Sequence, residues 1–162
     1  MTLANTILDK GYALIDNLGR TIETADLSQI LFRVPIWKHI YHTLYWFDYW
    51  FAGPEKFIGA SFHVPGLDSI DCLGTWEITK QQISEYYERV ADKSKKYLDM
   101  LTDDMLYEVA EGSDTNRLGL ILGQFRHGYA HLGNINGVTI LTTNKWPFVA
   151  GKAEDTWHGL YE

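Results

Sequence analysis

Hydrophobic residues recur with the period of an α-helix over four long segments of the chain. The segments cover residues 4–22, residues 34–51, a stretch that begins after Thr79, and about residues 115–138. A short helical turn can follow Thr102, whereas residues 52–77 and those after 139 contain Gly and Pro, lack the helical period and are predicted to be loops. No convincing alternation of polar and apolar residues indicates a strand. We therefore predict an all-α protein, a four-helix bundle that forms a single domain over residues 1–162.

Residues that favour helix ends support three of these boundaries. Thr79 can act as an N-cap, and Gln82 three residues later completes a capping box. Pro35 fits the first turn of the second segment, because its fixed φ suits a helix start. Ser113 or Asp114 can cap the fourth segment.

The second and fourth segments lack the polar face of a surface helix. The second, "VPIWKHIYHTLYWFDYWF", is apolar on opposite sides, so we expect it to be central in the bundle or covered by a second subunit. In the fourth, four polar residues follow one another within an otherwise apolar stripe: Gln124, His127, His131 and Asn134. This segment also holds five glycines, which predict close approach of neighbouring helices: Gly119, Gly123, Gly128, Gly133 and Gly137.

The spacing of His127 and His131 places both imidazoles on one face of a helix. Polar groups in a buried stripe need partners, and a metal ion would satisfy two imidazoles together. A third ligand would come from the second segment, where His39 and His42 are the candidates. The alternative is a pair of core histidines bonded to backbone groups or tyrosines. The residues alone leave both interpretations open.

Other kinds of metal site fit the sequence less well. Positions 128–130 between the paired histidines are Gly-Tyr-Ala, so the H-E-x-x-H motif of zinc proteases is missing. No Glu stands three residues before a His, which argues against a ferritin-like di-iron site. Asp48 lies on the apolar stripe of the second segment, where it can either orient a metal ligand or make a local structural hydrogen bond.

Composition narrows the class of protein. The formal net charge of −7 argues against electrostatic binding of DNA or RNA, because the chain would repel their phosphates. Cys72 is the single cysteine, so an internal disulfide cannot form. The first residues lack a signal-peptide pattern, and no apolar run approaches the length of a membrane span. We therefore expect a soluble, cytoplasmic protein that does not associate with membranes.

Two histidine-bearing stretches, in this order, resemble a known family. They are "WKHIYHTLYWFDYWF" at 37–51 and "LGQFRHGYAHLGNING" at 122–137, and the opening of the third segment, "TKQQISEY", is similar as well. Together they resemble the DinB-like (DinB/YfiT) superfamily of metal-dependent proteins. The resemblance implies a four-helix bundle with a non-standard helix order, usually homodimeric. It also implies one divalent metal ion, Zn or Ni, held by three histidines.

The resemblance assigns the ligands residue by residue. His127 and His131 carry over directly, and His42 is chosen as the third ligand because it precedes "TLYWFD"; His39 is the fallback. Side chains that can line the pocket or orient a ligand are Tyr45, Trp46, Asp48, Tyr49, Gln124 and Asn134.

The function that the resemblance implies is that of a metal-dependent enzyme acting on a small molecule, such as a low-molecular-weight-thiol S-transferase. In such an enzyme the metal activates the thiol, which then attacks an electrophile. One alternative is a metal-dependent hydrolase. Another is a non-enzymatic, metal-stabilised dimer that binds a ligand or takes part in a stress response.

Overall fold

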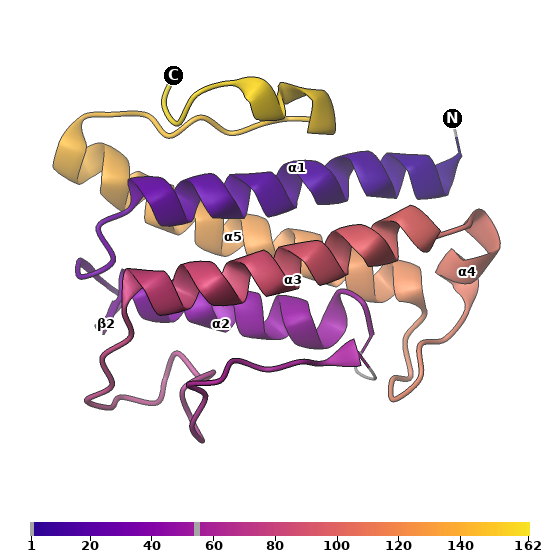
Figure 1. Cartoon of the computed structure of the whole chain (residues 1–162), viewed down its shortest axis with the longest axis horizontal. Coiled ribbons are helices and arrows are strands. Elements are labelled where there is room, and N and C mark those ends of the chain that lie inside the picture. The colour runs from indigo at the N-terminus through magenta and orange to yellow at the C-terminus, as the bar shows by residue number, and fades with distance from the viewer. Residues whose placement is uncertain (1, 54–55) are drawn as a thin grey trace.

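Four long α-helices pack side by side in the computed structural model, which describes residues 2–53 and 56–162. They are α1 (Leu3–Thr24), α2 (Ile36–Trp50), α3 (Lys80–Met100) and α5 (Arg117–Thr143). The shorter elements are β1 (Ile30–Leu31), β2 (Val34–Pro35), α4 (Asp103–Tyr107) and the 3-10 helix η2 (Ala153–Trp157). Both α1 and α2 pack against α3 and α5 (Figure 1). The prediction of a mostly helical protein is confirmed.

Side-chain caps fix the starts of α1, α3, α4 and α5. The capping box of Thr79 and Gln82 is present, as predicted. The start of α5 differs from the prediction, because Asn116 caps it by accepting a hydrogen bond from the Gly119 N–H, whereas Ser113 and Asp114 lie before the helix. This helix also continues through residues 139–143, which were predicted to be loop, and ends at Asn144 in the left-handed conformation.

A two-stranded hairpin stands immediately before α2, where no strand was predicted. Leu31 pairs with Val34, so Phe32 and Arg33 form the tip, with φ values of 48° and 74°. Strands of two residues are too short to show a period in the sequence. Because residue 35 belongs to the hairpin, α2 begins at Ile36 and Pro35 occupies the N-cap position rather than the first turn.

The second helix is largely covered within the chain. Every residue of α2 is buried or half-buried. One side faces α3 and α5, and the described part of the segment 51–79 runs along the other (Figure 1). The Asp48 carboxylate holds this segment by accepting hydrogen bonds from the N–H groups of Ile58 at 3.3 Å and Gly59 at 2.8 Å. The predicted central position of this helix is therefore reached without a second subunit.

Only one of the α5 glycines makes the close helix contact that the sequence predicted. A Cβ atom at Gly128 would lie 2.9 Å from the Phe47 ring, so this glycine lets α5 approach α2. The prediction is wrong for Gly123, Gly133 and Gly137, where a Cβ would meet nothing within 4 Å. Those three positions face open space.

The C-terminal segment lies along α1 (Figure 1). Asn17 donates a hydrogen bond to the Ala150 carbonyl and accepts one from the Ala150 N–H, at 2.9 and 2.8 Å. Asp9 accepts a hydrogen bond from the Ala153 N–H at 2.9 Å. Among the described residues, no helix combines the length and the apolar character that crossing a bilayer would need.

Candidate metal centre

Three histidines from two helices meet between α2 and α5. His42 projects from α2, while His127 and His131 project from successive turns of α5. One nitrogen of each lies within 4.8 Å of the others, and all three side chains are half-buried. The Nε2 atoms of His42 and His127 are 3.1 Å apart. The structure thus brings together the three residues predicted as ligands.

This spacing suits a first-row metal ion. A tetrahedral zinc ion with Zn–N bonds of about 2.0–2.1 Å holds its ligand nitrogens about 3.3 Å apart. The separation of 3.1 Å between His42 and His127 is already close to that value. Imidazole nitrogen is a favoured ligand of both zinc and nickel. The cluster could therefore hold a divalent ion.

The His42 ring is oriented for metal binding by a backbone group. Its Nδ1 lies 2.6 Å from the Asp68 carbonyl oxygen, in the segment that covers α2. A carbonyl oxygen only accepts hydrogen bonds, so Nδ1 carries the proton and Nε2 presents its lone pair to the cluster. This partner has no signal in the sequence, because any residue at position 68 would supply the same carbonyl.

The Nδ1 atoms of the two α5 histidines are held less firmly than that of His42. Nδ1 of His127 lies 3.4 Å from the Gln124 Oε1, one turn earlier in the helix. Nδ1 of His131 is buried and has no hydrogen-bond partner among the described residues. A buried polar atom without a partner is unusual in a folded protein. Binding of an ion to the cluster would give this otherwise unpaired imidazole a partner that the chain does not provide.

Burial keeps all three imidazoles neutral. Desolvation is the main cause that lowers the pKa of His127 to about 4 and the pKa of His131 to about 3, and neighbouring histidines lower both further. Desolvation also lowers the pKa of His42 below its usual value. Metal ions bind the neutral form of imidazole, so these side chains are in the binding form at neutral pH without first losing a proton.

The fallback ligand His39 lies beside the cluster but takes part in another contact. It is buried, and its Nε2 lies 2.7 Å from the Leu31 carbonyl oxygen in the hairpin. Its ring centroid is 5.7 Å from that of His131, and its Nδ1 has no partner among the described residues. His39 joins the hairpin to α2, and the grouped ligand atoms come from His42 rather than from His39.

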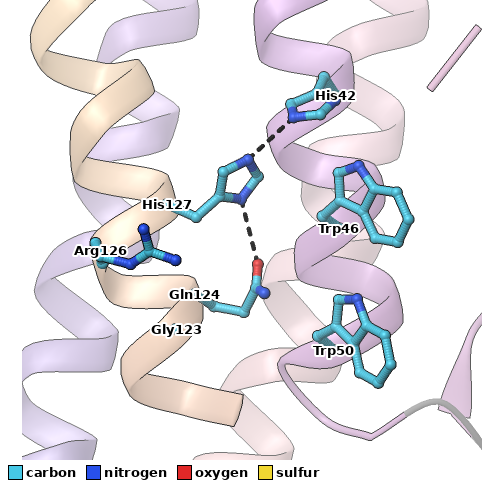
Figure 2. A pocket seen from close by; sticks show the side chains of 7 residues that line it. All are labelled: His42, Trp46, Trp50, Gly123, Gln124, Arg126 and His127. Carbon is cyan, nitrogen blue, oxygen red and sulfur yellow. Dashed lines mark hydrogen bonds between the residues drawn. The ribbon is translucent and has the colours of Figure 1, made fainter. Parts of the chain in front are cut away.

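The cluster opens into a pocket of about 370 Å³ between α2 and α5. The lining residues are His42, Trp46 and Trp50 from α2 and Gly123, Gln124, Arg126 and His127 from α5 (Figure 2). Of the side chains predicted to line a pocket, Trp46 and Gln124 do so. Tyr45 instead stacks on His63, with ring centroids 5.2 Å apart, and Tyr49 packs against Phe57.

Two other predicted side chains lie outside the site. Asp48 is fully buried, but it pairs with Lys93 at 2.5 Å and accepts a hydrogen bond from the Tyr86 hydroxyl at 2.8 Å. Of the two roles that the sequence allowed, orienting a metal ligand or making a structural hydrogen bond, Asp48 therefore has the structural one.

Asn134 is exposed and does not line the pocket. The buried amide close to it on α5 is Asn136, which accepts a hydrogen bond from the Thr21 hydroxyl at 3.2 Å. Sequence analysis missed Trp50 and Arg126 as pocket residues.

Comparison of the chain with protein-family models, with curated proteins and with solved structures found no match. Membership of the DinB-like superfamily therefore stays a prediction that rests on the histidine motifs.

Proposed function

We propose that the protein is a metal-dependent enzyme of the DinB-like type, a low-molecular-weight-thiol S-transferase. One divalent ion, zinc or nickel, would be held by His42, His127 and His131. The observation that carries this proposal is the convergence of three neutral imidazoles at an open pocket.

The number of ligands favours catalysis over a structural role. Structural zinc sites have four protein ligands, whereas catalytic sites have three and leave a position for water or substrate. Among the described residues, the group that includes the three histidines contains no carboxylate or cysteine. The pocket reaches His42 and His127 directly, so a small molecule has access to the fourth position.

The donor set favours thiol chemistry. Three neutral imidazoles leave the double positive charge of a bound ion uncompensated, so such an ion strongly favours the deprotonated form of a thiol. In the proposed reaction the thiol proton passes to solvent, sulfur forms a bond to an electrophilic carbon of the substrate, and the leaving group departs with its bonding electron pair. The chain orients His42 through the Asp68 carbonyl, and Trp46 lines the pocket beside it.

A hydrolase would make a further demand on the pocket. An ion held by three neutral imidazoles would acidify a bound water as well as a thiol, so activation of the nucleophile does not separate the two reactions. Hydrolysis of an amide also needs a group that donates a proton to the leaving nitrogen, within hydrogen-bond reach of it. The described lining residues other than the two histidine ligands are indoles, a glycine, an amide and a guanidinium, none of which donates a proton in this way at neutral pH. The thiol reaction needs no such donor when its leaving group departs as a stable anion such as chloride.

Metal content and thiol consumption test this proposal together. We expect about one equivalent of zinc or nickel in the purified protein by elemental analysis, and its loss in His42→Ala, His127→Ala and His131→Ala. His158→Ala, in the exposed C-terminal segment, is the control that should keep the metal.

Thiol consumption tests the activity. The metal-loaded protein should consume a small thiol in the presence of 1-chloro-2,4-dinitrobenzene, and treatment with EDTA should abolish this consumption. A protein that takes up no metal contradicts the proposal; metal without thiol consumption contradicts the transferase activity alone.

A further inference from the structure

Arg126 gives the pocket a positive charge that no carboxylate in the described part of the chain neutralises. It precedes the ligand His127 on α5, is exposed, and extends beside the pocket (Figure 2). Among the described residues, no carboxylate forms an ion pair with it, although the chain contains 21 acidic residues. A guanidinium presents a planar set of donors that matches an oxyanion such as a carboxylate.

The opposite wall of the pocket is apolar and flat. Trp46 and Trp50 lie one turn apart on α2, so both indoles border the same space (Figure 2). On the α5 side, Gly123 leaves the wall open, since a Cβ there would meet no atom within 4 Å. A volume of about 370 Å³ lies within the range of pockets that bind small organic molecules.

We infer that the pocket binds a small molecule that combines a carboxylate with a flat apolar body. The carboxylate pairs with Arg126, and the apolar body lies against Trp46 and Trp50. The inference deepens the proposed function and rests on it for one point, that the reactive end of the molecule faces the three histidines. The recognition itself uses only the guanidinium and the indoles, so it can be measured with or without a metal ion.

A pair of probes that differ only in charge tests the role of Arg126. The probes are 3-phenylpropionate and its neutral amide, with binding followed by tryptophan fluorescence or calorimetry. We expect the acid to bind about tenfold more tightly than the amide, the size expected of one charge-assisted hydrogen-bonded pair. In Arg126→Gln this preference should disappear while the affinity for the amide stays the same. Arg89→Gln, which removes an exposed arginine from α3, is the matched control and should keep the preference.

A second pair of variants tests the place of binding. Leucine at Gly123 would project into the pocket, whereas leucine at Gly137 would stand on the same helix outside it; neither position is crowded. We expect Gly123→Leu to weaken the binding of both probes at least tenfold and Gly137→Leu to leave both unchanged. Equal affinity for acid and amide, equal behaviour of Arg126→Gln and Arg89→Gln, or no binding of the acid at millimolar concentration would overturn the inference.

Metal content measured on the same samples separates this inference from the proposed function. The titrations are run on protein loaded with zinc and on protein treated with EDTA. A chain that binds no metal but keeps the Arg126-dependent preference for the acid contradicts the proposed function alone. A chain that binds metal and shows no such preference contradicts this inference alone.

Discussion

The Nδ1 atom of His42 lies 2.6 Å from the carbonyl oxygen of Asp68, which joins a predicted metal ligand to the segment that covers α2. The same segment is held to α2 by the Asp48 carboxylate, through the backbone N–H groups of Ile58 and Gly59. A buried carboxylate that is not itself in the cluster therefore helps to hold the segment that carries the Asp68 carbonyl.

We predict that Asp48→Asn destabilises the protein and also weakens metal binding. The substitution leaves the Lys93 ammonium without its buried counter-ion, which costs about 3 kcal/mol of unfolding free energy. Loosening of the covering segment should reduce zinc affinity about tenfold, as is usual when a group that orients a ligand is lost. Urea unfolding and competition with a zinc chelator measure the two effects. Asp92→Asn breaks an exposed ion pair with Lys96 and should change neither.

A metal ion that binds the folded chain should stabilise it by mass action. Free zinc at a hundred times its dissociation constant is expected to raise the free energy of unfolding by about 2.7 kcal/mol. Thermal unfolding with and without zinc measures this as an increase in Tm. The increase should vanish in His131→Ala and persist in His158→Ala. An equal increase in both variants would place the ion elsewhere on the chain.

Stability of the metal-free protein should decrease in mild acid. Burial lowers the pKa of His127 to about 4 and that of His131 to about 3, whereas in the unfolded chain both titrate near 6.5. Between these values the unfolded chain binds more protons than the folded chain, so the free energy of unfolding falls as pH decreases from about 6.5 toward 4. Urea unfolding at several pH values measures the slope. The double variant His127→Asn/His131→Asn should show a shallower slope, and an unchanged slope would assign the effect to other groups.

The glycines of α5 should respond oppositely to alanine. At Gly133 and Gly137 a Cβ meets no atom within 4 Å, so alanine should stabilise the helix by about 0.5–1 kcal/mol at each position. At Gly128 the Cβ would lie 2.9 Å from the Phe47 ring, and alanine should destabilise the protein by about 1–3 kcal/mol. Denaturant unfolding of the three variants measures these changes. Stabilisation by Gly128→Ala would show that α2 and α5 can separate freely.

The helical period was sufficient to predict the four long helices and to place His127 and His131 on one face of α5. The period could not choose between His39 and His42, since both lie on a helix that is buried all around. The deciding difference is a backbone contact: His39 meets the Leu31 carbonyl, whereas His42 meets the Asp68 carbonyl and faces the cluster. Backbone carbonyls have no sequence signature.

Two further errors of the sequence analysis, at Asn134 and Arg126, have physical causes of the same kind. Asn134 continues the polar stripe of α5 in the sequence, but it is exposed, because α1 packs against the neighbouring side of the helix, where Asn136 meets Thr21. Arg126 was missed because a lone arginine beside a buried stripe is normally a solvent-facing residue. Its relevance depends on the pocket next to it and on the absence of an ion-pair partner among the described residues, and both are properties of the folded chain.

The covering of α2 by the segment 51–79 has a consequence for proteolysis. A single cut in this segment would remove no helix and break no contact between α2 and α5. It would, however, free the chain that covers the outer side of α2, where Tyr41, Tyr45 and Tyr49 pack against aromatic rings of the segment. The nicked protein would keep its helical content but present an aromatic surface to other molecules, and self-association rather than unfolding would be the first sign of damage.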